Sequence, residues 1–174
     1  LLFRRADPGT LPAHVTRHVS AKPPSSLPLS RRPPLFPYVL HAGSTPIFLD
    51  TAAVTLVETQ FRRTADLEAF ALLAYCFMPD HLHVLAEGAT PVADFPKFVR
   101  LAKQRAGALF KRVYGAPLWQ VGYHERVLRA GDDARAVARY ILANPVRAGL
   151  VRSPLEYPYL GSDVWRIEDL IASV

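Results

Sequence analysis

Residues 70–88 read FALLAYCFMPDHLHVLAEG, and this stretch decides the fold. Its first eight residues, 70–77, form a continuous apolar run of strand length, which is typical of a central strand. Residues 78–80 (MPD) interrupt the run, because proline cannot donate to a sheet ladder. Residues 81–87 then return to a strand pattern. The stretch therefore predicts two successive strands of one sheet.

Strand and helix patterns flank this stretch on both sides. In chain order we predict a strand at 36–42, a helix at 51–63, a helix at 95–114, a strand at 123–128 and a helix from about 133 to 144. Asp50 and Asp94 are suitable N-caps for the first two helices, and Asp132 or Asp133 for the third. The third helix must stop near Asn144, because Pro145 disfavours a helical residue before it. In the helix at 95–114 we expect an inward apolar stripe made of Phe98, Leu101, Leu109 and Val113.

The order strand, helix, strand, strand, helix, strand, helix predicts the fold class. It indicates an α+β domain with a ferredoxin-like antiparallel sheet and helices packed on one face. The last helix, which carries Tyr140, is additional to that core. We place this domain at residues 35–174. Residues 1–34 precede it as a mostly irregular, Pro-rich arm, because eight of the 16 prolines fall in the first 37 residues and disfavour a regular helix or a central strand there.

Composition limits the partners and the compartment. Lys and Arg number 21 against 15 Asp and Glu, which gives a formal net charge of +6, and most of the cations are Arg. An Arg-rich surface suits a polyanionic partner, although a GC-rich coding sequence would also favour Arg. The single cysteine, Cys76, excludes an intramolecular disulfide and a multi-cysteine zinc site. Neither a membrane span nor a secretory signal is apparent, so we expect a cytoplasmic protein.

His81 and His83 form the first candidate site. Side chains alternate along a strand, so both imidazoles point to one face while Leu82 and Val84 point to the other. Two imidazoles on one face of a strand can bind a single metal ion. The alternative is a pair of solvated or hydrogen-bonded histidines.

Tyr140 and Asn144 form the second candidate site. They are four residues apart and share one face of the predicted helix. A phenol and an amide placed in this way can supply a nucleophile and a metal ligand. The alternative is a core tyrosine followed by an asparagine that ends the helix before Pro145.

A third feature is a polar face on the helix at 95–114. Its members recur at helical spacing and are Lys97, Arg100, Gln104 and Lys111. Most charged helix faces are only solvated. The functional alternative is a surface that binds a DNA backbone.

Three segments together resemble the REP-associated tyrosine transposases, which belong to the HUH superfamily of single-strand nucleases and transposases. The segments are AYCFMPDHLHVLAEG (74–88), LWQVGYHERVLR (118–129) and ARYILANPVRAGLV (138–151). The similarity covers roughly residues 36–162, in the family's order and spacing. It is weaker at the amino end, where residues 13–17 and 38–41 both resemble the family's first strand. We predict that 36–42 is that strand.

The resemblance implies roles for particular residues. His81 and His83 match the metal-binding histidines, Tyr140 matches the nucleophile, and Asn144 matches the polar residue that completes the metal site. Trp119, Gln120 and His124 match positions to which we assign no role. The segment 157–159 (YPY) matches a closing segment that we expect to act as a structural latch.

The implied activity is metal-dependent nicking and strand transfer on single-stranded DNA through a 5′-phosphotyrosine intermediate. Hairpin-forming repeats are the implied substrate. Imidazole and amide ligands suit Mg²⁺ or Mn²⁺, and Arg139 together with the polar helix face would contact DNA. Two alternatives stay open: a nucleic-acid-binding module without chemistry, and a metal-dependent hydrolase that uses water. Whether the protein is a monomer or a homodimer is also open.

Overall fold

The computed structural model describes residues 35–42, 46–120, 124–125 and 133–172. The expected arm at 1–34 lies outside these residues. The strands are β1 (Leu35–His41), β2 (Phe70–Met78), β3 (His81–Gly88), β4 (His124–Glu125) and β5 (Leu160–Gly161). The helices are α1 (Thr51–Leu67), α2 (Phe95–Tyr114), α3 (Ala134–Leu142), α4 (Asn144–Arg147) and α5 (Ile167–Ile171), with 3-10 turns η2 (Ile47–Leu49) and η3 (Pro154–Glu156). None of the described helices is long and apolar enough to cross a membrane.

The sheet confirms the predicted fold class. The described strands are ordered β4-β1-β3-β2-β5, and every neighbouring pair is antiparallel. The chain order β1-α1-β2-β3-α2-β4 is the ferredoxin-like arrangement. β5 adds a short strand beside β2. β1 occupies the position predicted at 36–42, so the choice between the two candidate first strands is settled in its favour.

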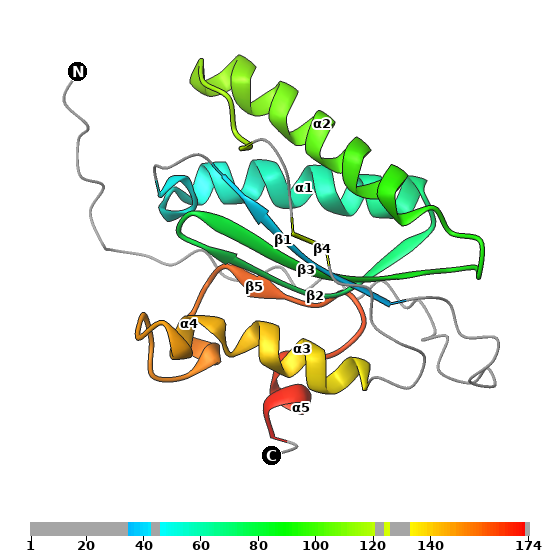
Figure 1. Ribbon diagram of the computed structural model, residues 1–174. Helices are drawn as coiled ribbons and strands as arrows, with labels where there is room; N and C mark the ends of the chain where they lie inside the picture. The colour runs from blue at the N-terminus through cyan, green and yellow to red at the C-terminus, as the bar shows by residue number, and fades with distance from the viewer. Residues whose placement is uncertain (1–34, 43–45, 121–123, 126–132, 173–174) are drawn as a thin grey trace.

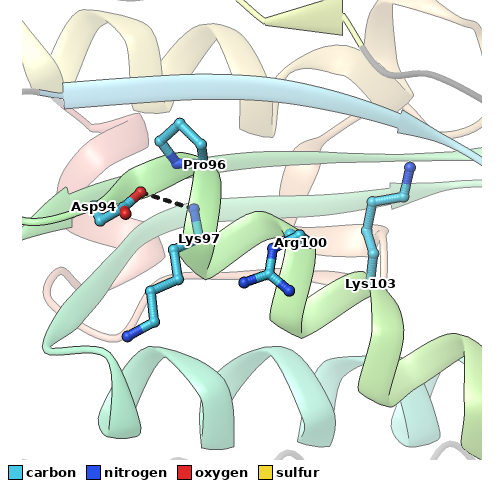
Figure 2. Close-up of a pocket in the computed structure, with 5 residues that line it drawn as sticks. All are labelled: Asp94, Pro96, Lys97, Arg100 and Lys103. Atoms are coloured by element: carbon cyan, nitrogen blue, oxygen red, sulfur yellow. Dashed lines mark hydrogen bonds between the residues drawn. The ribbon is translucent and has the colours of Figure 1, made fainter.

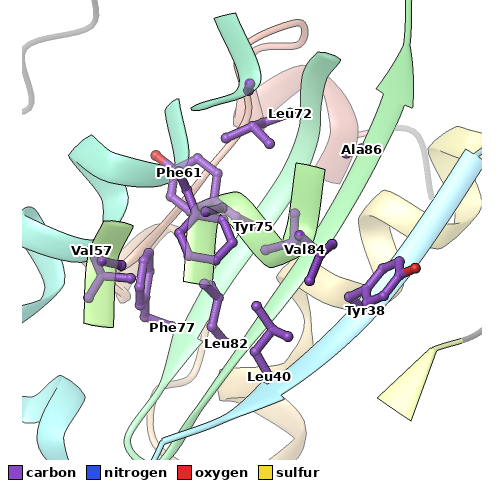
Figure 3. Close-up of a cluster of buried hydrophobic side chains, with 14 of the residues drawn as sticks. Tyr38, Leu40, Val57, Phe61, Leu72, Tyr75, Phe77, Leu82, Val84 and Ala86 are labelled. Atoms are coloured by element: carbon purple, nitrogen blue, oxygen red, sulfur yellow. The ribbon is translucent and has the colours of Figure 1, made fainter. Parts of the chain in front are cut away.

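Helices cover both faces of the sheet. α1 and α2 lie on one face, whereas α3, α4 and α5 lie on the other (Figure 1). The face under α1 and α2 holds the larger core, in which aromatic rings from both helices meet the strands. Figure 3 shows the part of it where Phe61 of α1 lies near Tyr75 and Phe77 of β2. Its large members are Tyr38, Phe48, Phe61, Phe70, Phe77, Phe95, Phe98 and Phe110. Burial of each such side chain contributes on the order of 2 kcal/mol, so this core dominates the stability of the domain.

A second core lies between the sheet and α3. Cys76, Met78 and Leu85 point toward this side from β2 and β3, and they meet Ile141 and Leu142 of α3. A register shift between Leu72 and Ala74 marks a bulge in β2. This core attaches the helix that carries Tyr140 to the strand that carries the two histidines.

Two details of the helices differ from expectation. α1 continues past Arg63 to Leu67, because Thr64 and Ala65 are buried and extend its inner face. The buried stripe of α2 consists of Phe95, Phe98, Val99, Ala102, Ala106 and Phe110. Of the expected stripe, Phe98 is buried, Leu101 and Leu109 are only half-buried, and the expectation for Val113 was wrong, since it is 60% exposed. Ala102 and Ala106 carry the stripe instead, because α1 and α2 lie side by side and small residues allow close approach.

The C-terminal segment is fastened to the end of β2. The Tyr157 hydroxyl donates to the Phe77 carbonyl at 2.7 Å, and the Phe77 amide donates to the Tyr159 carbonyl at 2.8 Å. Nearby, the Arg62 guanidinium contacts the Tyr75 hydroxyl at 2.7 Å and also the Asp163 carboxylate. These contacts join α1, β2 and the segment after β5.

Gly161→Ala is expected to lower the free energy of unfolding by about 1–3 kcal/mol, the usual cost of overpacking. A Cβ at this position would overlap the Tyr75 hydroxyl. That hydroxyl is held by Glu58 and Arg62, so it cannot move away without breaking hydrogen bonds. Urea unfolding followed by circular dichroism measures the change. A loss under about 0.5 kcal/mol would show that Tyr75 relaxes freely.

Candidate functional site

His81 and His83 point to the face of the sheet that α3 covers. Their neighbours Leu82 and Val84 belong to the core under α1 and α2. In the antiparallel register, His81 pairs with Met78 and His83 pairs with Cys76, and both of those residues belong to the core under α3. The histidines and the helix of Tyr140 therefore lie on the same side of the sheet.

The two imidazoles face each other closely. Their Nε2 atoms are 3.0 Å apart, which is also a hydrogen-bonding distance. On the far side of its ring, the Nδ1 atom of His81 lies 2.6 Å from the Asp80 carboxylate. This hydrogen bond places the proton of neutral His81 on Nδ1 and leaves the lone pair on Nε2. A carboxylate behind an imidazole is the usual way in which proteins orient a metal-binding histidine.

Protonation states agree with this arrangement. Burial lowers the pKa of His83 to about 4, with smaller effects from the charges of His81, His41 and Arg147. The hydrogen bond from His81 lowers the pKa of Asp80. At neutral pH His83 is therefore uncharged, which is the form of imidazole that binds metal ions.

The spacing of the imidazoles fits one divalent ion. Octahedral ions bound at about 2.1 Å hold adjacent ligand atoms about 3.0 Å apart, which matches the distance between the two Nε2 atoms. Within the described residues, no three His, Cys, Asp or Glu side chains gather as a metal site would require. Among the described residues, a third protein ligand would therefore be of another kind, such as the amide predicted at Asn144.

Asn144 begins α4, directly after Ala143, which is the C-cap of α3. Its Nδ2 atom donates to the Ile141 carbonyl at 3.1 Å, and its Oδ1 atom accepts from Arg147 at 3.4 Å. The amide oxygen therefore points toward Arg147 and keeps a second lone pair beside this long contact. Its role as a ligand stays a prediction.

Tyr140 lies in the last turn of α3 and is 56% exposed. Its neighbour Ile141 is buried against the sheet and fixes the helix in place. The Arg147 guanidinium lies 4.1 Å from the centroid of the Tyr140 ring. The phenol is accordingly accessible to a large substrate and has a cation against its ring.

Two residues of this region were missed by the sequence analysis. Arg147 follows Tyr140 by seven residues, a helical spacing that was overlooked because Pro145 was treated as the end of the helix. His41 pairs in register with His81, and their ring centroids are 5.4 Å apart. The alternation of the strand at 36–42 was the signal that could have placed His41 beside the site.

The predicted DNA-contacting residues do not form one surface. Arg139 lies in α3 and pairs with Asp133 at 3.6 Å. Lys97, Arg100, Gln104 and Lys111 are exposed on α2, which covers the opposite face of the sheet (Figure 1). The polar helix face is therefore separated from the histidines by the sheet, and its function stays a prediction.

An open depression lies along the first half of α2. Its lining residues are Asp94, Pro96, Lys97, Arg100 and Lys103 (Figure 2). Lys97 pairs with Glu68 at 2.8 Å, whereas no ion pair of Arg100 is present among the described residues. Arg100 is therefore the better placed of the two cations to meet a phosphate.

Arg100→Ala is expected to weaken the binding of single-stranded DNA and to flatten its salt dependence by about 0.7 per lost phosphate contact. Lys97→Ala should have a smaller effect, because Lys97 already has a carboxylate partner. Fluorescence anisotropy at several salt concentrations measures both. An unchanged salt slope in Arg100→Ala would show that this face is only solvated.

Trp119 has a structural role. Its indole Nε1 donates to the Lys103 carbonyl at 3.0 Å, and its ring packs near Phe48 and Phe61. The backbone amide of Gln120 donates to the His41 carbonyl at 3.1 Å, and this bond holds the segment against β1. His124 pairs through β4 with Val39.

No family model and no curated protein matches the chain. Among solved structures, the chain is similar to a REP-associated tyrosine transposase bound to a REP hairpin, with a TM-score of 0.63 and 21% identity over 74% of this chain and 76% of that one. It also matches a Deinococcus radiodurans R1 protein that is named only provisionally as a transposase, with a TM-score of 0.47 and 23% identity over 63% of this chain and 88% of that one. The chain thus has the α+β fold of the first structure.

Proposed function

We propose that the protein nicks single-stranded DNA and rejoins it through a covalent link to Tyr140, with the help of a divalent metal ion. The observation that carries this proposal is the placement of His81, His83 and Tyr140 on one side of the sheet. A nucleic-acid-binding module without chemistry would have no need to orient an imidazole pair on the same side of the sheet as an exposed phenol. The hairpin bound by the structure of similar fold supports hairpin-forming repeats as the substrate.

His81, His83 and Asn144 would hold the ion, for which we propose Mg²⁺ or Mn²⁺. When bound, such an ion acts as a Lewis acid on a phosphate oxygen. Asp80 orients the His81 ring, and burial keeps His83 uncharged. Because all three proposed ligands are neutral, none of them would offset the positive charge at the scissile phosphate.

Tyr140 would act as the nucleophile. Its phenolic oxygen forms a bond to phosphorus, and its proton passes to water. The bond from phosphorus to the 3′ oxygen breaks, and that oxygen takes up a proton. The products are a 5′-phosphotyrosine and a free 3′ hydroxyl. One phosphodiester replaces another, so a second 3′ hydroxyl can reverse the step and join a new end.

The location of an end label on the DNA tests this proposal. The purified protein is incubated with Mn²⁺ and a hairpin oligonucleotide that has single-stranded flanks, and the products are run on a denaturing gel. A label at the 3′ end should move into a protein-linked band, whereas a label at the 5′ end should appear in a shorter free fragment. Cleavage without any protein-linked band would indicate a hydrolase, and tight binding without cleavage would indicate a binding module.

A further inference from the structure

Arg147 contacts more of the proposed site than any one of the predicted residues does. Its guanidinium lies 4.1 Å from the Tyr140 ring centroid, and its Nη1 atom is 3.4 Å from the Asn144 amide oxygen. One side chain thus adjoins the proposed nucleophile and the proposed amide ligand.

The charge of Arg147 lacks a carboxylate partner in the described part of the chain. The ion pairs found there involve Arg62, Lys97, Arg139 and Arg166 but not Arg147. Arg147 is exposed. Its guanidinium has five N–H donors, and the long contact to Asn144 uses one of them. The remaining donors are available to an anion that approaches Tyr140 from solvent.

The position of Arg147 is set by the short helix after Tyr140. The Arg147 amide donates to the Ala143 carbonyl at 3.0 Å, which continues the helical path across the end of α3. The aromatic ring of Tyr140 then supports the guanidinium plane, because a cation is attracted to the face of an aromatic ring. The side chain is therefore placed before any substrate arrives.

We infer that Arg147 is a catalytic residue that binds the non-bridging oxygens of the phosphodiester attacked by Tyr140. This inference rests on the proposed function, and it extends the site to a residue that the sequence analysis did not assign. Guanidinium binds phosphate through two parallel N–H donors, so it orients the group as well as attracting it. Negative charge that accumulates on those oxygens during attack would be stabilised by the same donors.

The test measures binding in a protein that cannot cut. Tyr140→Phe keeps the aromatic ring under Arg147, so the DNA stays intact while the guanidinium keeps its support. In this background, Arg147→Gln should lower the affinity for a single-stranded hairpin oligonucleotide roughly tenfold and reduce the salt slope by about 0.7. Arg63→Gln removes the same charge from an exposed position on α1, across the sheet, and should leave both values unchanged.

An uncharged analogue of one DNA phosphate tests whether Arg147 contacts that phosphate. The nick is first mapped with wild-type protein, and a methylphosphonate is then placed at that one linkage. It should weaken binding as Arg147→Gln does, and the two changes together should lower the affinity no more than either change alone.

The rate of adduct formation provides a second measurement. In the protein that keeps Tyr140, Arg147→Gln should slow single-turnover adduct formation roughly 10²-fold or more, with partial recovery in Arg147→Lys. Additive losses, or an unchanged adduct rate, would overturn the inference while leaving the proposed function intact. If wild-type protein forms no adduct, the proposed function fails, and the salt slope alone then decides whether Arg147 meets a phosphate.

Discussion

A Tyr140→Phe variant is expected to form no covalent adduct and to nick single-stranded DNA at least roughly 10³-fold more slowly than wild type, because it lacks the attacking oxygen. The change removes one exposed atom and keeps the ring that faces Arg147. Stability should therefore change by no more than about 1 kcal/mol. The measurement is the end-labelled denaturing gel, together with a urea unfolding curve for each protein.

Tyr114→Phe provides a matched control for this loss. Tyr114 is also exposed, but it ends α2 across the sheet, where its hydroxyl donates to Asp50 at 2.9 Å. The control should retain full adduct formation. If the folded Tyr140→Phe protein instead cleaves at a rate close to wild type, water is the nucleophile and the protein is a hydrolase.

His83→Ala is expected to abolish Mn²⁺-dependent nicking while sparing most of the DNA affinity measured without metal. The variant removes one of two Nε2 atoms that lie 3.0 Å apart, so the remaining imidazole would bind an ion alone. Loss of a catalytic metal removes several kcal/mol of charge stabilisation, which corresponds to roughly 10³-fold or more in rate. Calorimetric titration with Mn²⁺ and single-turnover nicking measure the two effects separately.

Asp80→Asn is expected to have a weaker effect on metal binding than His83→Ala. Its side chain bonds to the far side of the His81 ring, so metal affinity should fall roughly 10- to 100-fold without disappearing. Nicking should recover when Mn²⁺ is raised, unlike nicking by His83→Ala. Unchanged Mn²⁺ affinity in His83→Ala would place the ion elsewhere and remove the main support for the proposed mechanism.

The parts of the fold that depend on local pattern were predictable. The strand pair at 70–88 and the caps at Asp50, Asp94 and Asp133 follow from periodicity and from single side chains that bond to nearby backbone. The short strand β5 was not predicted, because it depends on pairing with β2 across more than eighty residues. A two-residue strand leaves almost no pattern of its own.

Only the features of the site that depend on local sequence were predictable. His81 and His83 share a face by strand alternation, and this alternation alone predicts their common direction. The position of Arg147 depends on how the chain resumes a helix at Asn144, with Pro145 in its first turn. Proline is tolerated there because the first-turn amides have no helical acceptor, so it marks a beginning as readily as an end. Large apolar residues were also expected to form the buried stripe of α2, but Ala102 and Ala106 occupy buried positions in it.

The sheet separates the two regions in which we propose DNA contacts. This separation determines how long a DNA strand must be to reach both of them. Tyr140 belongs to α3 and Arg100 to α2, and these two helices lie on opposite faces of the sheet (Figure 1). Packed layers are about 10 Å apart, so a strand that touches both must travel at least about 20 Å around an edge of the sheet. At roughly 3.4 Å per nucleotide, the rise of a stacked helical strand, that path takes about six nucleotides, and an extended strand needs fewer. Oligonucleotides too short for this path can occupy only one side at a time, so the length of the DNA, and not only its sequence, would determine whether occupancy of the α2 layer contributes to cutting at the α3 layer.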